Sequence, residues 1–212
     1  MPTDRLAHTV RGQLGIGRVL PLGEAADGSW ITEQAAAGVL REAAAAVAGG
    51  RLGALRIALA GGESPGAAAD VAAPPSALPP GPLRIEADFE ATGDRPLPAT
   101  ADELRAALAD SADADLGLVV TAIDLRVSGL LDDDRPRGEH GERADRGGQR
   151  AAGGAGEGAA SVPGVARLTS RLGGVGPDVL TQIAVAAGWR ALDVARAVRA
   201  RVGVAVLVTD VE

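Results

Sequence analysis

One order of secondary-structure signals occurs twice in this chain: a helix, two strands, a second helix and a last strand. The first copy spans residues 29–131. The second copy, residues 159–212, is shorter, and Gly-rich sequence stands in the place of its first helix. A repeated order of elements predicts that each copy builds a small mixed sheet. The sequence therefore predicts an α+β protein made of two helix–strand–strand–helix–strand units.

The two helices of the first copy have recognisable ends. Thr32 is expected to cap the first helix, which Gly49-Gly50 stops. The second helix is expected to begin with a capping box from Thr100 to Glu103 and to end at Gly117. Each helix carries one apolar stripe, as is typical of helices that pack on a core.

Strands are predicted where apolar and polar residues alternate, at residues 52–60, 83–91 and 118–127 of the first copy. The middle stretch is the most regular, with charged residues at every second position from Arg84 to Glu90. Such alternation predicts a strand with one buried face and one solvated face.

The second copy repeats the later part of this order. Strands are expected at residues 166–172, 179–187 and 204–211, and a helix at residues 190–202. The last strand is nearly all apolar, which predicts a central or doubly covered position in its sheet.

Three segments lie outside these elements. Residues 1–28 form an N-terminal segment, in which an amphipathic helix over 3–14 is expected to pack on the first unit or to dock on a partner. The loop 61–82 is rich in proline and is expected to be extended in its second half. Residues 132–158 have almost no large apolar side chains and predict a disordered linker.

Composition excludes several kinds of chemistry. The chain has no Cys, Lys or Tyr, so disulfides, thiol nucleophiles and lysine catalysis are excluded. The net charge of −7 argues against a general nucleic-acid binder. No run approaches the roughly 20 apolar residues of a membrane span, and no signal-peptide pattern begins the chain. We expect a cytoplasmic protein that reaches the membrane only through a partner.

Few residues are candidates for catalysis or metal binding. His8 and His140, the only histidines, lie in the terminal segment and in the linker, where a fixed hydrogen-bond partner is not expected. Asp110, Asp113 and Asp115 lack the Gly and Glu that a calcium loop needs. We therefore predict no catalytic residue, cofactor or metal site, and a non-enzymatic protein.

Two charged surfaces are the candidates for interaction. One is the polar face of the strand 83–91, and the other surrounds the last helix, where snorkelling around a buried stripe and a small anionic site are alternative interpretations. Their residues are Arg84, Glu86, Asp88, Glu90, Arg190, Arg196, Arg199 and Arg201.

Two stretches resemble the bacterial alkaline-shock, or envelope-stress-response, protein family. They are the run from Ile31-Thr32-Glu33 to Leu55-Arg56-Ile57, and the run from Val162-Pro163-Gly164-Val165 to the Val-rich end of the chain. The resemblance implies cytoplasmic proteins that act through protein contacts near the membrane. The proline-rich loop, the tandem copy and the linker depart from the single-domain pattern. The chain also resembles GC-rich bacterial proteins that carry a nucleopolyhedrovirus family label, which implies no mechanism.

These observations favour an interaction or scaffold protein of the envelope-stress-response type, with protein partners or further copies of itself. The alternative is a small-ligand-binding domain or enzyme whose site uses Asp, Glu and Arg between the two units.

Overall fold

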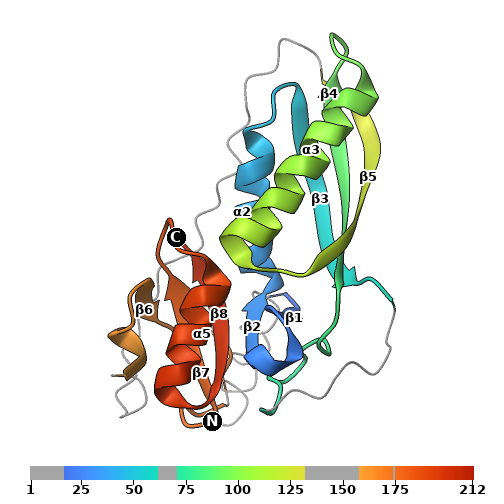
Figure 1. The fold of residues 1–212 in the computed structure, drawn as a ribbon. Helices are drawn as coiled ribbons and strands as arrows, with labels where there is room; N and C mark the ends of the chain where they lie inside the picture. The colour runs from blue at the N-terminus through green and yellow to red at the C-terminus, as the bar shows by residue number, and fades with distance from the viewer. Residues whose placement is uncertain (1–16, 62–70, 132–157, 174) are drawn as a thin grey trace, which may run out of the picture.

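The computed structural model describes residues 17–61, 71–131, 158–173 and 175–212. These residues form a mixed α+β fold with two sheets, as predicted (Figure 1). The predicted helix over 3–14, the first part of the loop 61–82 and nearly all of the linker 132–158 lie outside the described residues.

The first copy builds a three-stranded sheet in the order β3-β4-β5, in which β3 and β4 are antiparallel and β4 and β5 are parallel. Helices α2 and α3 lie together on one face of this sheet (Figure 1). The apolar side chains of β4 are buried on that face and its charged side chains lie on the other, as the alternation predicted. The bounds are α2 Glu33–Ala45, β3 Gly50–Leu59, β4 Leu83–Thr92, α3 Leu97–Ser111 and β5 Val120–Leu131.

The second copy contributes to a five-stranded sheet in the order β1-β2-β8-β7-β6. Strands β6 and β7 are antiparallel, while β7 and β8 are parallel and are joined through α5. The bounds are β1 Val19–Pro21, β2 Ser29–Thr32, β6 Val165–Leu168, β7 Leu180–Val185, α5 Ala191–Val202 and β8 Ala205–Val211.

The two copies therefore share one topology. In each, an antiparallel pair is followed by a crossover helix and a parallel strand, which gives β3-β4-α3-β5 and β6-β7-α5-β8. The copies differ at the outer edge of the last strand. Strand β2 pairs in parallel with β8, whereas no described strand occupies the corresponding side of β5.

The helix ends follow the predictions except at two places: α2 already ends at Ala45, because the turn into β3 takes up the residues before Gly50, and α3 begins before Thr100. Thr32 caps α2, since its hydroxyl accepts the Ala35 N–H, and Gly117 ends the π-helical turn that extends α3, at a φ of 80°. The capping box predicted at Thr100 is wrong, because α3 already begins at Leu97. Pro98 explains the earlier start, since a proline in the first helical turn gives up an N–H that has no partner there.

The short strand β2 joins the first copy to the sheet of the second. Its residues Ser29, Trp30 and Ile31 lie opposite Val206, Leu207 and Val208 of β8, and β1 pairs with its other side. The sequence predicted neither strand. As a result β8 lies in the middle of its sheet, which confirms the central position that its apolar sequence predicted.

One hydrophobic core runs through both sheets. Its buried members include Leu40 and Leu104 on the helices of the first copy, Phe89 on β4, and Val194 and Val206 in the second copy. A core shared in this way couples the unfolding of the two sheets, because a cavity opened on either side weakens the same packed cluster.

This coupling predicts that Phe89→Ala destabilises the five-stranded sheet as well. The fully buried ring lies in the three-stranded sheet, and its loss is expected to cost about 3–5 kcal/mol. In a Trp189→Phe background, fluorescence reports Trp30, which is buried on strand β2 of the five-stranded sheet. The urea midpoint measured by this fluorescence should fall together with the midpoint measured by circular dichroism.

Val179→Ala is the control for this experiment, because Val179 is 57% exposed and its truncation is expected to change stability by less than about 0.5 kcal/mol. A fluorescence midpoint that stayed constant while the circular dichroism midpoint fell would show that the two sheets unfold separately.

Candidate functional site

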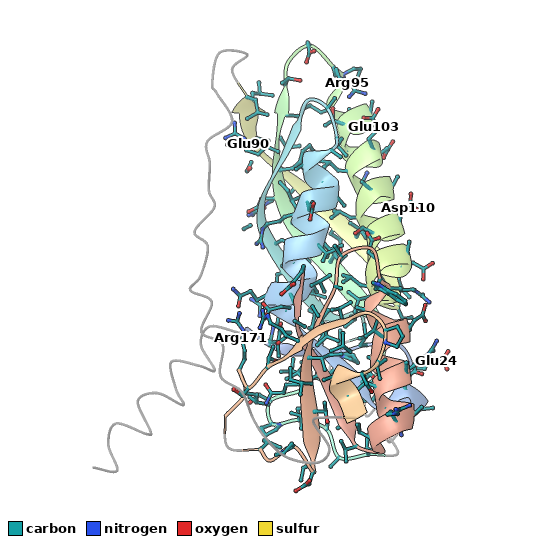
Figure 2. The ribbon with its side chains drawn as sticks, turned by 90° about the vertical axis from the view of Figure 1, so that its left-hand side faces the viewer. Glu24, Glu90, Arg95, Glu103, Asp110 and Arg171 are labelled. Carbon is teal, nitrogen blue, oxygen red and sulfur yellow. The ribbon has the colours of Figure 1, made fainter. Side chains whose placement is uncertain are left out.

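The polar face of the three-stranded sheet is a ladder of charged side chains of both signs. All four candidate residues of β4, Arg84 to Glu90, lie on the face opposite α2 and α3, and no described helix or strand covers that face. Figure 2 shows Glu90 on the strand side of this layer, while Glu103 and Asp110 lie on the helix side. We call this surface the open face; its charged residues are Arg51, Arg56, Arg84, Glu86, Asp88, Glu90, Asp124 and Arg126.

Ion pairs across neighbouring strands hold these side chains in place. Arg84 Nε lies 2.7 Å from Asp124 Oδ2 and 3.3 Å from Glu86 Oε1. Arg126 donates from two nitrogens to both carboxylate oxygens of Asp88, with Nε 2.8 Å from Oδ1. The hydrogen bond from Arg126 holds the pKa of Asp88 below its usual value, and the bond to Asp124 raises the pKa of Arg84.

The open face is electrically balanced although the chain as a whole carries a net charge of −7. Four arginines stand against four carboxylates, and a shallow hollow of about 440 Å³ lies in the middle of the ladder. Among the residues that line the hollow are Ala54, Arg56, Glu86 and Asp124. The sequence predicted the β4 residues of this surface, but their partners on β3 and β5 emerge only from the strand register.

The arginines of α5 bind other parts of the same chain. Arg190 donates to the Asp113 carboxylate at 2.9 Å and to its backbone oxygen, which ties α5 to the π-helical turn that extends α3. Arg196 makes two hydrogen bonds to Asp27, the closer at 2.7 Å, and Arg199 donates to the backbone oxygen of Ala26. These three side chains are therefore internal anchors, and Arg201 is exposed near the helix end.

A second hollow lies beside these anchors. It has a volume of about 220 Å³ and is lined by Asp27, Arg196, Arg199, Ala200 and Gly203. Burial opposes ionisation of Asp27, but hydrogen bonds from Arg196 and from the Glu24 N–H outweigh it and hold the pKa of Asp27 below its usual value. The Asp27 carboxylate thus neutralises much of the positive charge that an anionic ligand needs.

The junction of the two sheets carries a pair that the sequence did not single out. Arg18 binds both oxygens of Glu33, and the pair reaches Ile57 on the outer edge of β3. Glu33 Oε1 accepts the Ile57 N–H at 3.0 Å, and Arg18 Nη2 donates to the Ile57 C=O at 2.7 Å. Burial opposes ionisation of Glu33, but these hydrogen bonds outweigh it and lower its pKa.

The remaining acidic candidates have structural partners. Asp113 binds Arg190, and Asp115 accepts a hydrogen bond from Ser111 at 2.7 Å. His8 and His140 lie outside the described residues. Within the described ranges, no three His, Cys, Asp or Glu side chains converge in a way that could hold a metal ion.

Comparison with protein-family models, with curated proteins and with solved structures found no match to this chain. Among the described residues, no helix is both long and apolar enough to cross a membrane.

The Arg18–Glu33 pair predicts an acid-sensitive contribution to stability. Glu33→Gln should lower the free energy of unfolding by about 1–3 kcal/mol near neutral pH, since it leaves a partly buried guanidinium without its charge partner. Because the pKa of Glu33 is lowered in the folded state, this contribution is complete above the ordinary value of 4.5 and is lost as the pH falls through the folded value.

Urea unfolding of the wild type and of Glu33→Gln at several pH values between about 7 and about 3 checks this expectation, because the two stabilities should converge in acid. Glu42→Gln, at an exposed position of the same helix, is the matched control and should follow the wild type throughout. A constant difference between wild type and Glu33→Gln down to the lowest pH contradicts the assignment.

Proposed function

We propose that this chain is a non-enzymatic interaction protein of the envelope-stress-response type, which binds a protein partner through the open face of the β3-β4-β5 sheet. The observation that carries the proposal is the ladder itself. Its eight charged side chains form a continuous polar surface that no described element covers, on a sheet whose other face is filled with core.

Preorganised charges favour recognition of one partner over others. Three of the four arginines and all four carboxylates of the ladder are held in ion pairs, so less side-chain entropy is lost when a partner docks. A fixed pattern of both signs also rejects surfaces that bring like charges together, which costs several kcal/mol in an interface. The partner we propose is therefore a protein surface with the reverse pattern of charges.

The resemblance to the envelope-stress-response family supports the same class of function. That family implies cytoplasmic proteins that work through protein contacts near the membrane, so we propose that the partner is attached to or lies beside the membrane. Binding of this kind requires no catalytic residue, cofactor or metal.

One observation favours the alternative of a small-ligand site, at a place between α5 and the N-terminal segment rather than between the two copies. The hollow beside Asp27 lies where α5 meets the connection between β1 and β2, and Arg199 forms part of its wall. A small anion is the ligand that this wall suits best, although Asp27 competes for the charge of Arg196.

A photo-crosslinking amino acid at Ala54 tests the proposed function, since Ala54 is exposed and lines the hollow of the open face. Irradiation in cells should join the chain to a distinct protein, identified by mass spectrometry. The crosslinker at exposed Ala106, on the outer side of α3, should not give this product. Glu86→Arg should abolish the product, because it places a third arginine beside Arg56 and Arg84 in the ladder.

Asp102→Arg is the matched control: it also reverses an exposed carboxylate that pairs with one arginine, but it lies on α3. It should leave the crosslinked product intact. Equal crosslinking from Ala54 and Ala106, or a product that persists in Glu86→Arg, rejects the open face as the binding surface.

A further inference from the structure

Strand β5 is a long edge strand with exposed apolar side chains. It runs for 12 residues, and in the part of the chain that the structure describes it pairs only with β4. Large exposed apolar residues gather on or beside it, namely Val119 at 43%, Val127 at 44% and Leu130 at 65% exposure. A free edge of this length and composition is a template for pairing with another strand.

The opposite edge of the same sheet is protected. Strand β3 changes register between Leu52 and Leu55, which interrupts a regular edge. At Ile57 the outward N–H and C=O groups are already bound by Glu33 and Arg18. Strand β5 also shifts register, at Thr121 and at Ser128, but residues 122–127 between these two points keep a regular register with β4. This central part of β5 therefore offers a regular row of backbone donors and acceptors on its outer side.

The repeated topology gives independent support. Strand β8 holds the same position in the second copy that β5 holds in the first, and its outer edge accepts β2 as a further strand. In both copies the last strand follows a crossover helix and has an outer edge. In the second copy β2 pairs with this edge, and in the first copy no described strand does.

We propose that β5 pairs antiparallel with β5 of a second copy of this chain, about a two-fold axis at Leu125. The two three-stranded sheets then form one six-stranded sheet. This pairing uses the strand edge and does not require the protein partner proposed above. The dimer joins two open faces into one continuous surface.

The sequence of β5 is self-complementary in this register. Centred on Leu125, Asp124 lies opposite Arg126 of the second copy, and Ile123 lies opposite Val127. Each dimer then contains two ion pairs, in which Asp124 of each copy faces Arg126 of the other. The apolar side chains of Ile123, Leu125 and Val127 form a cluster about the axis. Cross-strand pairs of these kinds each stabilise an antiparallel sheet by about 0.2–1 kcal/mol.

Neighbouring registers bring like charges together or mix the two faces. Moving the centre by one residue sets Asp124 opposite its own copy, or Arg126 opposite its own copy. If the two-fold axis lies midway between two residues, Leu125 faces a charged side chain and the helices of the second copy turn to the other side of the sheet. Only the register centred on Leu125 keeps both open faces together and pairs opposite charges.

This register also continues the charge ladder. Arg56, Glu86 and Asp124 form one row across β3, β4 and β5. The row passes to Arg126 and Asp88 of the second copy, which already pair with each other within each chain. Glu86 and Asp124, two adjacent carboxylates in the row, gain a guanidinium on the side that lies open in a single copy.

Sedimentation equilibrium of the full chain at concentrations up to about 100 μM tests the proposal, because a dissociation constant in the micromolar range populates a dimer there. Asp124→Arg and Arg126→Asp each convert two attractive pairs into two repulsive ones and should weaken dimerisation about tenfold or more. The double variant Asp124→Arg/Arg126→Asp restores both pairs and should recover the wild-type constant.

Mixing provides the sharper test. The two single variants complement each other, because the arginine introduced at position 124 of one chain then faces the aspartate introduced at position 126 of the other. The two unchanged residues, Arg126 of the first variant and Asp124 of the second, also face each other. The mixture should form a heterodimer about as stable as the wild-type dimer, although each variant alone is weakened. Asp102→Arg and Arg105→Asp are matched controls: they reverse charges on the solvent side of α3, away from β5, and should leave dimerisation unchanged.

A wild-type chain that stays monomeric over this range overturns the proposal. So does a dimer that both single reversals leave intact, or single variants that fail to combine when mixed. Because only purified chain is used, these outcomes are separate from those of the crosslinking at Ala54, which lies on the other edge of the sheet.

Discussion

The chain leaves the five-stranded sheet at Thr32 and enters α2, which packs on the three-stranded sheet, at Glu33, and the arrangement of both sheets depends on this junction. The Thr32 hydroxyl caps α2 and also donates to the Thr209 C=O of β8, so the end of β2 is fixed in the five-stranded sheet. One residue later, Glu33 binds Ile57 of the three-stranded sheet. Two adjacent side chains therefore set where one layer ends and the other begins, and the shared core fills the space between them.

The sequence predicted those elements whose signals are local. The alternation of β4 assigned each of its side chains to the correct face, and the spacing of α5 predicted a helix at residues 190–202 that matches the structure within a residue. Strand β2 carried no such signal, because its few residues gain stability only from β8, which lies more than 170 positions away. Thr100 shows the converse: it has the form of a cap, but Pro98 starts the helix before it.

The candidate surfaces were predictable to a similar degree. The alternation of polar and apolar positions along β4 is sufficient to place Arg84 and Glu86 on a solvated face. The ladder also requires the register of β4 with β3 and β5, which depends on the crossover through α3. The arginines of α5 could be placed around the helix from spacing alone. Their role as anchors could not, because Asp27 and Asp113 come from distant parts of the chain and meet α5 only in the folded protein.

The difference between the two copies explains why charges lie on β5 at all. In the second copy β2 covers the outer edge of β8, which allows that strand to be almost entirely apolar. Strand β5 has the same topology without a described neighbour on that side, and Asp124 and Arg126 interrupt its apolar residues. Charges on an exposed edge oppose indiscriminate pairing, because most registers bury them against apolar or like-charged residues. A pair of opposite charges two positions apart does more: it excludes those registers and leaves one in which the strand matches its own copy.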